Sequence, residues 1–359
     1  MKTVFDICVL PGDGIGVEVI DATLPILEKL QRGAGFELRL KHYPAGAQHY
    51  KATGEALPEV SFAAAQSADA ILFGAMGWPE IRYPDGTEIA PQLDLRFRLE
   101  LYAGVRPARA IPGVPPALAD PRAKDIDLVL IRESTEGLFA SRGKGVVEDD
   151  REARDTMVIT RAGSERVHEF AFRLAERRKQ RGKPGSVTCV DKANVFVSMA
   201  YFRKIFDEVA ARHPGVAAKH HYVDATALDL VRKPWTFDVI VTENMFGDIL
   251  SDQAAALVGG MGMAPSADVG DAHGLFQPCH GSAPDITGQG KANPTATFLS
   301  AAMMLDWLAE RSGSTVLAQA AGKLERAVDA VFAPGRVRPY ELGGNDGTVA
   351  IRDAVLSNL

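Results

Sequence analysis

The chain has 359 residues, of which 46% are hydrophobic and 24% charged, and its formal net charge is −6 at pH 7. This length exceeds the size at which a single hydrophobic core stops growing, so we expect two domains. The excess of acidic residues argues against bulk electrostatic binding to nucleic acid or to an anionic membrane. Three scattered cysteines without a C-x-x-C pair favour a reduced cytoplasm over a disulfide framework or a zinc ribbon.

The start of the chain carries no recognisable export or membrane signal. Its first apolar run, residues 5–10, ends in Pro-Gly-Asp and is too short for a signal peptide. No apolar run approaches the roughly 18 residues expected of a membrane helix. We therefore expect a cytoplasmic protein.

Short apolar runs alternate with longer amphipathic segments. The strand candidates are residues 5–10, 68–74, 127–133, 185–191 and 237–243. Helical periodicity runs from the glycine turn after the first strand to Leu30, and again over 163–181, 195–212 and 294–311. This alternation predicts an α/β fold with mostly parallel sheets covered by helices on both faces. Ligands of such sheets gather beyond the carboxyl ends of the strands.

Proline and glycine concentrate at 106–116 and 259–265, which we interpret as two crossings between domains. We predict a discontinuous cofactor-binding domain, 1–106 plus 259–359, and a dimerisation and substrate/metal domain, 107–258. The charged segment 146–163 is either a solvated loop or a hairpin arm, near 141–162, that reaches a partner subunit.

The motif "PGDGIG", residues 11–16, follows the first predicted strand. A glycine turn in this position invites comparison with dinucleotide-binding proteins. Its glycines are spaced G-x-G-x-G, however, and not G-x-G-x-x-G. The spacing therefore favours a plain strand-to-helix turn.

Two acids, Asp248 and Asp252, stand four positions apart in the apolar stretch "MFGDILSD". On a helix these positions share a face, where two like charges repel each other. One explanation is that both lie in the first helical turn, at the positive end of the helix dipole. The other is that a divalent cation lies between them. These residues alone leave both explanations open.

Three arginines form a second group of candidates. Arg96 and Arg106 flank one segment, and Arg132 directly follows the apolar run "DLVLI" at a predicted strand end. Arginine binds carboxylates through a rigid two-pronged fork, although most arginines are solvated surface residues. If the three converge, they indicate a substrate with two or more carboxylates.

Lys192 follows a predicted strand and is either a general base or a surface lysine. Asp224 stands where a helix begins and needs no role beyond capping it. The long loop 280–294 has small residues and backbone donors that suit a nucleotide, with Asp285 as an acceptor for ribose hydroxyls. As a mere connection it is unusually long.

Taken in order, "VDKAN", "ENMFGDILSD" and "HGSAPDI" with the later "ANP" resemble the family of β-decarboxylating dehydrogenases. That family includes isopropylmalate, isocitrate, homoisocitrate, and tartrate or D-malate dehydrogenases. The resemblance runs from "LPGDGIG" to "ELGGNDGT", nearly the full length. It implies a homodimer of two open α/β domains, without the Rossmann fingerprint, that catalyses oxidative decarboxylation with NAD and Mg²⁺ or Mn²⁺.

The resemblance also implies roles for single residues. Asp248 and Asp252 match metal ligands, and Asp224 matches a third that the other subunit donates. Lys192 matches the catalytic lysine, which also crosses from the partner and acts with Asp224. The remaining matches are the substrate clamp, Arg96, Arg106 and Arg132, and the adenosine site, His280, Gly281, Ser282, Ala283, Asp285, Ile286 and Asn293. An aspartate at 285, where NADP users carry lysine, favours NAD.

The chain departs from the family pattern at the substrate pocket. Phe139 stands where the family usually has a tyrosine that acts as the acid at C3. Gln92 and Leu93 stand where isopropylmalate enzymes tend to have two leucines, and Gln277 replaces a common glutamate. Tartrate, D-malate and homoisocitrate therefore stay open as substrates, as does a catalytically silent or regulatory paralogue. The apolar Phe139 favours a 3-alkylmalate, so we predict a 3-isopropylmalate dehydrogenase of leucine biosynthesis.

Overall fold

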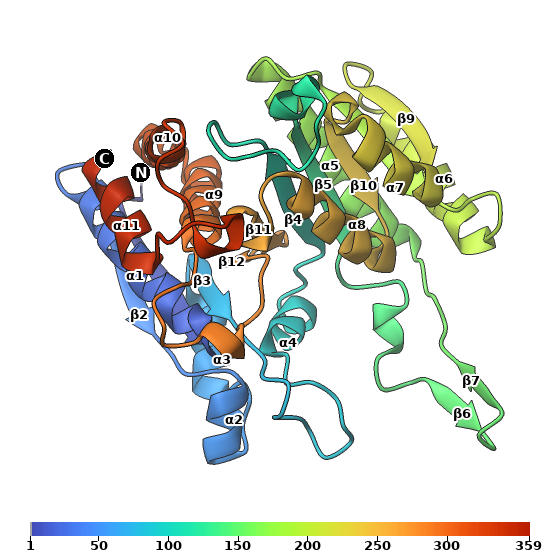
Figure 1. Ribbon diagram of the computed structural model, residues 1–359. Coiled ribbons are helices and arrows are strands. Elements are labelled where there is room, and N and C mark those ends of the chain that lie inside the picture. The colour runs from blue at the N-terminus through green and yellow to red at the C-terminus, as the bar shows by residue number, and fades with distance from the viewer. Residues whose placement is uncertain (1) are drawn as a thin grey trace. The chain divides into compact units, whose positions relative to one another are not determined.

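The computed structural model describes residues 2–359, which form two compact units (Figure 1). Unit 1 holds the described residues up to Glu100 together with Ile111–Pro116 and Val258–Leu359. Unit 2 holds Leu101–Ala110 and Ala117–Leu257. The boundary predicted at residue 106 falls inside a strand of unit 2, because an apolar strand continues through the arginine at that position.

Unit 1 is built on five strands in the order β2-β1-β3-β12-β11. Their bounds are β1 Val4–Gly12, β2 Glu37–His42, β3 Ala70–Ala75, β11 Pro265–Val269 and β12 Gly274–Pro278. All pairs are parallel except β11 with β12. All six residues of β3 are buried, as expected of a continuous apolar run at the centre of a parallel sheet. The carboxyl ends of β1, β3 and β12 therefore share one edge.

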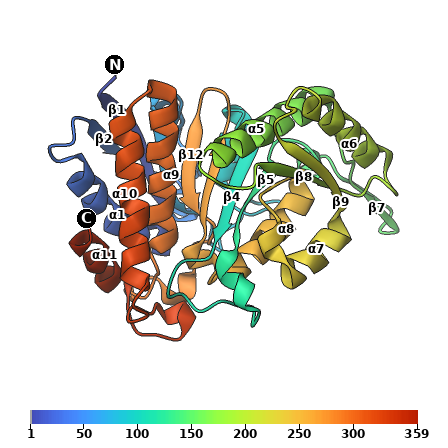
Figure 2. The ribbon, with the colours of Figure 1, turned by 90° about the horizontal axis from the view of Figure 1, so that it is seen from above.

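The helices of unit 1 are α1 Ile15–Gln31, α2 Ala47–Thr53, α3 Glu59–Ser67, α4 Pro91–Arg98, α9 Thr295–Ser312, α10 Thr315–Phe332 and α11 Thr348–Ser357. Helix α1 packs on β1, β2 and β3, whereas α9 packs on β3, β11 and β12. Helix α10 lies along α9, and α11 contacts both α1 and α10 (Figure 2). The predicted helix at 294–311 is thus confirmed as the buried α9.

Unit 2 has five strands in the order β4-β5-β10-β8-β9. They are β4 Ala103–Arg109, β5 Asp127–Glu133, β8 Ser186–Asp191, β9 Ala217–Tyr222 and β10 Val239–Thr242, and only β4 runs antiparallel to its neighbour. Helices α5 Arg161–Gln180 and α6 Val197–Ala210 cover one face, and α7 Val223–Arg232 and α8 Asn244–Leu257 cover the other (Figure 2). The predicted α/β fold with mostly parallel sheets is confirmed.

A hairpin projects from unit 2 (Figure 1). It consists of β6 Val146–Glu148 and β7 Glu152–Arg154, an antiparallel pair whose six residues are all exposed. Of the two interpretations of this segment, the hairpin is therefore the one that forms. A lone two-stranded hairpin is at best marginally stable in water, so this arm is suited to contact with another surface. No helix among residues 2–359 is long and apolar enough to cross a membrane.

A partly buried ionic cluster ties the segment that follows α6 to α5. The ring of His213 stacks on Phe172, with ring centroids 5.2 Å apart. Its Nδ1 lies 2.8 Å from Glu176 and its Nε2 lies 2.9 Å from Glu169. Burial alone would lower the pKa of His213, but the hydrogen bonds to the two glutamates outweigh burial and raise it.

The pKa of His213 is higher in the folded than in the unfolded state, so protonation of this residue stabilises the folded protein. This stabilisation is fully present below the unfolded pKa, about 6.5, and is lost as pH rises through the folded pKa. We expect His213→Gln to lower the free energy of unfolding by about 1 kcal/mol more at pH 5.5 than at pH 9, after allowance for partial solvent screening. Urea unfolding of both proteins at the two pH values measures this difference. An equal loss at both pH values would show that His213 contributes only packing.

Candidate active site

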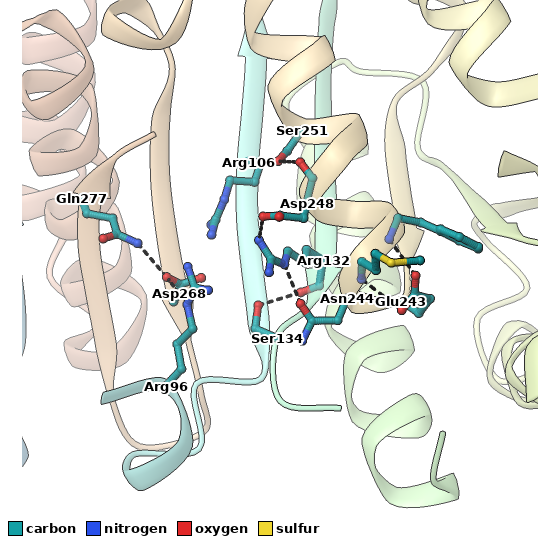
Figure 3. A network of polar contacts seen from close by, with 12 residues as sticks. Arg96, Arg106, Arg132, Ser134, Glu243, Asn244, Asp248, Ser251, Asp268 and Gln277 are labelled. Carbon is teal, nitrogen blue, oxygen red and sulfur yellow. Dashed lines mark hydrogen bonds and ion pairs between the residues drawn. The ribbon is translucent and has the colours of Figure 1, made fainter. Parts of the chain in front are cut away.

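Arg132 lies at the centre of a network of polar contacts near the carboxyl ends of the strands of unit 2 (Figure 3). It lies near the end of β5 with its side chain 4% exposed. Its Nε donates to Oδ1 of Asn244 at 2.8 Å, and its Nη1 forms an ion pair with Asp248. The guanidinium carbon stands 4.8 Å from the centre of the Phe139 ring. The fork is thus held by partners on both sides before any ligand arrives.

Gly247 allows α8 to approach Arg132 this closely. A Cβ at this position would lie 2.7 Å from the Cβ of Arg132. Arg106 joins the same face of the sheet, because it pairs in register with Leu130 and strand residues two apart share a face. Both arginines are buried, so unit 2 alone supplies two of the three predicted clamp residues.

Helix α8 begins at Asn244 and is capped by the preceding residue. The carboxylate of Glu243 accepts from the N–H groups of Met245 and Phe246, at 3.0 and 2.6 Å. Asp248 and Asp252 are therefore the fifth and ninth residues of α8, beyond its first turn. The first-turn explanation for this acidic pair is wrong, since Glu243 already meets the N-terminal donors.

The charges of this pair are only partly balanced within the chain. Burial and the neighbouring Asp248 raise the pKa of Asp252, while Arg106 and Arg132 act in the opposite direction. Asp248 is paired with Arg132 yet keeps half of its side chain exposed. Two carboxylates on one helix face, one of them destabilised as an anion, fit a hard divalent cation that binds oxygen ligands.

Lys192 and Asp224 form a separate pair in unit 2. Lys192 follows β8, Asp224 lies in the first turn of α7, and the lysine Nζ is 2.5 Å from the aspartate Oδ1. This hydrogen bond lowers the pKa of Asp224. Among residues 2–359, no three His, Cys, Asp or Glu side chains lie close enough together to hold a metal ion. One chain therefore does not bring Asp224 to Asp248 and Asp252.

An ion pair that the sequence analysis did not identify orients both of these residues. Arg203 of α6 donates to both carboxylate oxygens of Asp191, at 2.8 and 2.7 Å. Its guanidinium also stands 5.1 Å from the ring centre of Tyr222. Asp191 directly precedes Lys192, and Tyr222 precedes α7, so Arg203 ties both strand ends together. Nothing in the spacing of the sequence indicates this pairing.

The third predicted clamp residue, Arg96, lies in α4 of unit 1. Its Nε donates to Oδ2 of Asp268 at 3.0 Å, and Gln277 donates to the same oxygen at 2.9 Å (Figure 3). Asp268 is fully buried. A glutamate at position 277 would place a second carboxylate against Asp268, which explains the glutamine found here.

Gln92 and Leu93 occupy the first turn of the same helix, α4. Gln92 stands four residues before Arg96 and therefore on the same helix face. Its buried Oε1 has no hydrogen-bond partner among the described residues. A polar atom in this state is suited to a ligand that can donate a hydrogen bond.

The predicted nucleotide loop connects β12 to α9 in unit 1. His280 has its Nδ1 2.9 Å from the carbonyl oxygen of Gly281, and its buried Nε2 has no partner among the described residues. Burial lowers the pKa of His280, which favours the neutral ring. Asp285 is exposed within the short 3-10 helix Pro284–Ile286. An unpartnered ring nitrogen and an exposed carboxylate on one loop fit a nucleotide with free hydroxyl groups.

Other residues of this loop hold it in place. Ala283 and Ile286 pack against a buried cluster formed by Ile15 and Val19 of α1 together with Ala292. Asn293 donates to Glu341 and to the Met263 sulfur, and its Oδ1 accepts twice from Thr295. The side-chain amide of Asn293 is thus occupied, so any role of this residue at the adenosine rests on its backbone or on packing.

The "PGDGIG" motif forms the strand-to-helix turn between β1 and α1, as predicted. Gly14 has φ 57°, and a Cβ there would lie 2.1 Å from the carbonyl oxygen of Ser282. The glycine spacing therefore serves close packing against the predicted nucleotide loop.

Comparison with known proteins places this geometry in a family. The family model described as "Isocitrate/isopropylmalate dehydrogenase" matches residues 6–355. A "3-isopropylmalate/3-methylmalate dehydrogenase" of Methanocaldococcus jannaschii is 45% identical over 350 residues, 97% of each chain. A "Homoisocitrate dehydrogenase" of the same organism is 41% identical and covers 98% of this chain and 96% of its own.

A solved structure agrees with these matches. The isocitrate dehydrogenase from Methylococcus capsulatus superposes with a TM-score of 0.86 at 35% identity, covering 99% of both chains. The folds therefore correspond over the whole length, and the predicted resemblance is confirmed. The chain belongs to the isocitrate/isopropylmalate dehydrogenase family and is a decarboxylating dehydrogenase.

Proposed function

We propose that the protein catalyses the NAD- and divalent-metal-dependent oxidative decarboxylation of a 3-substituted (R)-malate, with 3-isopropylmalate as its substrate. The observation that carries the proposal is the buried Arg132 held against the incompletely balanced pair Asp248 and Asp252. A buried guanidinium next to two acids suits a substrate that brings both carboxylates and a metal-binding hydroxyl. A relative named for 3-isopropylmalate and 3-methylmalate supports this substrate class.

In this proposal the arginines orient the substrate. Arg106 and Arg132 share one face in unit 2 and bind its carboxylates. Asn244 holds the Nε edge of Arg132, so that the fork keeps one orientation when substrate enters. Such pre-orientation lowers the entropy lost on reaching the reactive geometry.

Asp248 and Asp252 of one subunit, with Asp224 of a second copy, hold the Mg²⁺ or Mn²⁺ in this proposal. When bound, the cation supplies Lewis-acid chemistry, lowering the pKa of the substrate hydroxyl and stabilising negative charge on its oxygen. Three carboxylates match the preference of these cations for oxygen ligands.

Lys192, paired with Asp224, would take up the proton of the C2 hydroxyl, and NAD, when bound, would supply the hydride acceptor for C2. The bond from C3 to its carboxylate then breaks and releases CO₂, and C3 gains a proton to give the 2-keto acid. Phe139 has no proton to give at this last step. Its ring instead stacks on Arg132 and forms an apolar wall.

We assign the loop from His280 to Asn293 to NAD. The exposed Asp285 accepts from a 2′-hydroxyl and repels a 2′-phosphate, which favours NAD over NADP. Because this loop belongs to unit 1, we assign cofactor binding to unit 1, and we assign metal binding and dimerisation to unit 2. The scattered thiols, of which Cys8 and Cys189 are buried, fit the proposed reducing cytoplasm.

We further propose a homodimer with shared active sites. Unit 2 exposes large apolar side chains on α7, α8 and the arm: Leu228, Val231, Ile249, Val146 and Val147. Helices α7 and α8 pack against each other, and apolar side chains exposed on adjacent elements are typical of an interface. A second copy would also bring the Asp224 that one chain does not supply to its own Asp248 and Asp252.

A polar substrate is the second candidate. The buried, unpartnered Oε1 of Gln92 favours a donor on the C3 substituent, as in tartrate, over an isopropyl group. A silent paralogue is not supported, because Lys192 and the three aspartates are all present.

A substrate panel tests the proposal. With NAD and Mn²⁺, we expect kcat/KM for 3-isopropylmalate to exceed those for D-malate, tartrate and homoisocitrate, and excess chelator to abolish turnover. The kcat/KM for NAD should exceed that for NADP by at least about tenfold, which corresponds to about 1.4 kcal/mol. A clear preference for tartrate would identify Gln92 as the residue that determines specificity. Full activity in excess chelator would refute the proposed dependence on a divalent metal.

The Phe139→Tyr variant tests whether the protein lacks a side chain that protonates C3 after decarboxylation. General acid help is worth about 100-fold or more, so the variant should release 2-keto acid faster on 3-alkylmalates if protonation of C3 limits the wild type. Single-turnover measurement separates NADH formation, which should change little, from keto acid release. A variant with unchanged or slower release would show that another group already supplies this proton.

A further inference from the structure

Asp13, the one acid of the "PGDGIG" turn, is buried at 1% exposure and accepts three backbone hydrogen bonds. Its Oδ2 accepts from the N–H groups of Ala47, at 2.7 Å, and Gly77, at 2.9 Å. Its Oδ1 accepts from the N–H of Gln48 at 2.8 Å. A carboxylate bonded in this way fixes the turn after β1, the start of α2 and the loop after β3 against one another.

The hydrogen bonds continue from Asp13 to the predicted nucleotide loop. The carbonyl oxygen of Gly77 accepts from the hydroxyl of the buried Ser282. The carbonyl oxygen of Ser282 in turn accepts from the N–H of Ile15, at 2.9 Å. Since Ile15 lies two residues after Asp13, the bonds form a closed ring. Gly14 lies within it, where no Cβ fits.

We propose that Asp13 is a positioning residue for nucleotide binding, acting through Gly77 and Ser282 on the loop that carries His280. This inference rests on the proposed function, because it takes that loop to be the NAD site. Asp13 is 1% exposed and uses both carboxylate oxygens to accept backbone bonds, so it acts on the ligand through the loop and not by direct contact. Its effect is to hold the loop in the binding geometry before NAD arrives, which reduces the entropy lost on binding.

Asp13→Asn tests this role with little change in volume. The amide has one accepting oxygen, and its NH₂ group faces a backbone donor, so at least one of the three N–H groups loses its partner. We expect the Kd for NAD, measured by calorimetry, to rise about tenfold or more. The KM for NAD should rise in parallel, while kcat at saturating NAD and the KM for the hydroxy acid stay within about threefold.

Asp69→Asn is the matched control. Asp69 also accepts from a backbone N–H of unit 1, that of Asp6 at 2.8 Å, but before β3 and away from the loop. It should leave the affinity for NAD within about twofold of the wild type. Amide hydrogen exchange gives a second readout, in which residues 279–288 should exchange faster in Asp13→Asn and unchanged in Asp69→Asn.

Unchanged exchange and unchanged NAD affinity in a folded Asp13→Asn protein would overturn the proposal. If that variant does not fold, Ser282→Ala removes the hydrogen bond to Gly77 instead. Residues 279–288 should then exchange faster in the NAD-free protein, and unaltered exchange there would overturn the proposal as well. A wild type that binds no NAD would refute the proposed function instead. The exchange comparison would still decide whether Asp13 positions the loop.

Discussion

The repulsion between Asp248 and Asp252 is the constraint on which the site depends. Helix α8 holds both acids on one face, and burial together with the neighbouring Asp248 raises the pKa of Asp252. Arg132 balances only part of this charge, through its ion pair with Asp248. The unit thus keeps an electrostatically unfavourable pair that a cation and a substrate would relieve, as functional sites often do.

Other features of unit 2 maintain this arrangement. Glu243 caps α8, Gly247 allows the helix to touch Arg132, and Asn244 bonds to the Arg132 side chain. Asn244 also donates to the carbonyl oxygen of Glu136, whose carboxylate accepts from the N–H of Thr160 at 2.8 Å. Both ends of the arm segment are therefore anchored next to Arg132.

Much of the fold could be predicted from periodicity, and the rest could not for identifiable reasons. The five predicted strands are buried apolar runs and are all confirmed. Strand β9 escapes this pattern because its sequence, AAKHHY, contains no buried apolar run and five of its six residues are exposed. Motif order led to Lys192 and the aspartates, whereas Asp191 with Arg203, and Asp13 with Gly77, depend on contacts between distant segments that no local pattern records.

Activity of mixed dimers tests the central claim, that each site combines Asp248 and Asp252 of one subunit with Lys192 and Asp224 of the other. Lys192→Ala and Asp252→Asn subunits, carrying different affinity tags, should each be inactive alone. After subunit exchange, half of the dimers are mixed and each should hold one intact site, giving roughly a quarter of wild-type activity. Purified mixed dimers without activity would contradict the account.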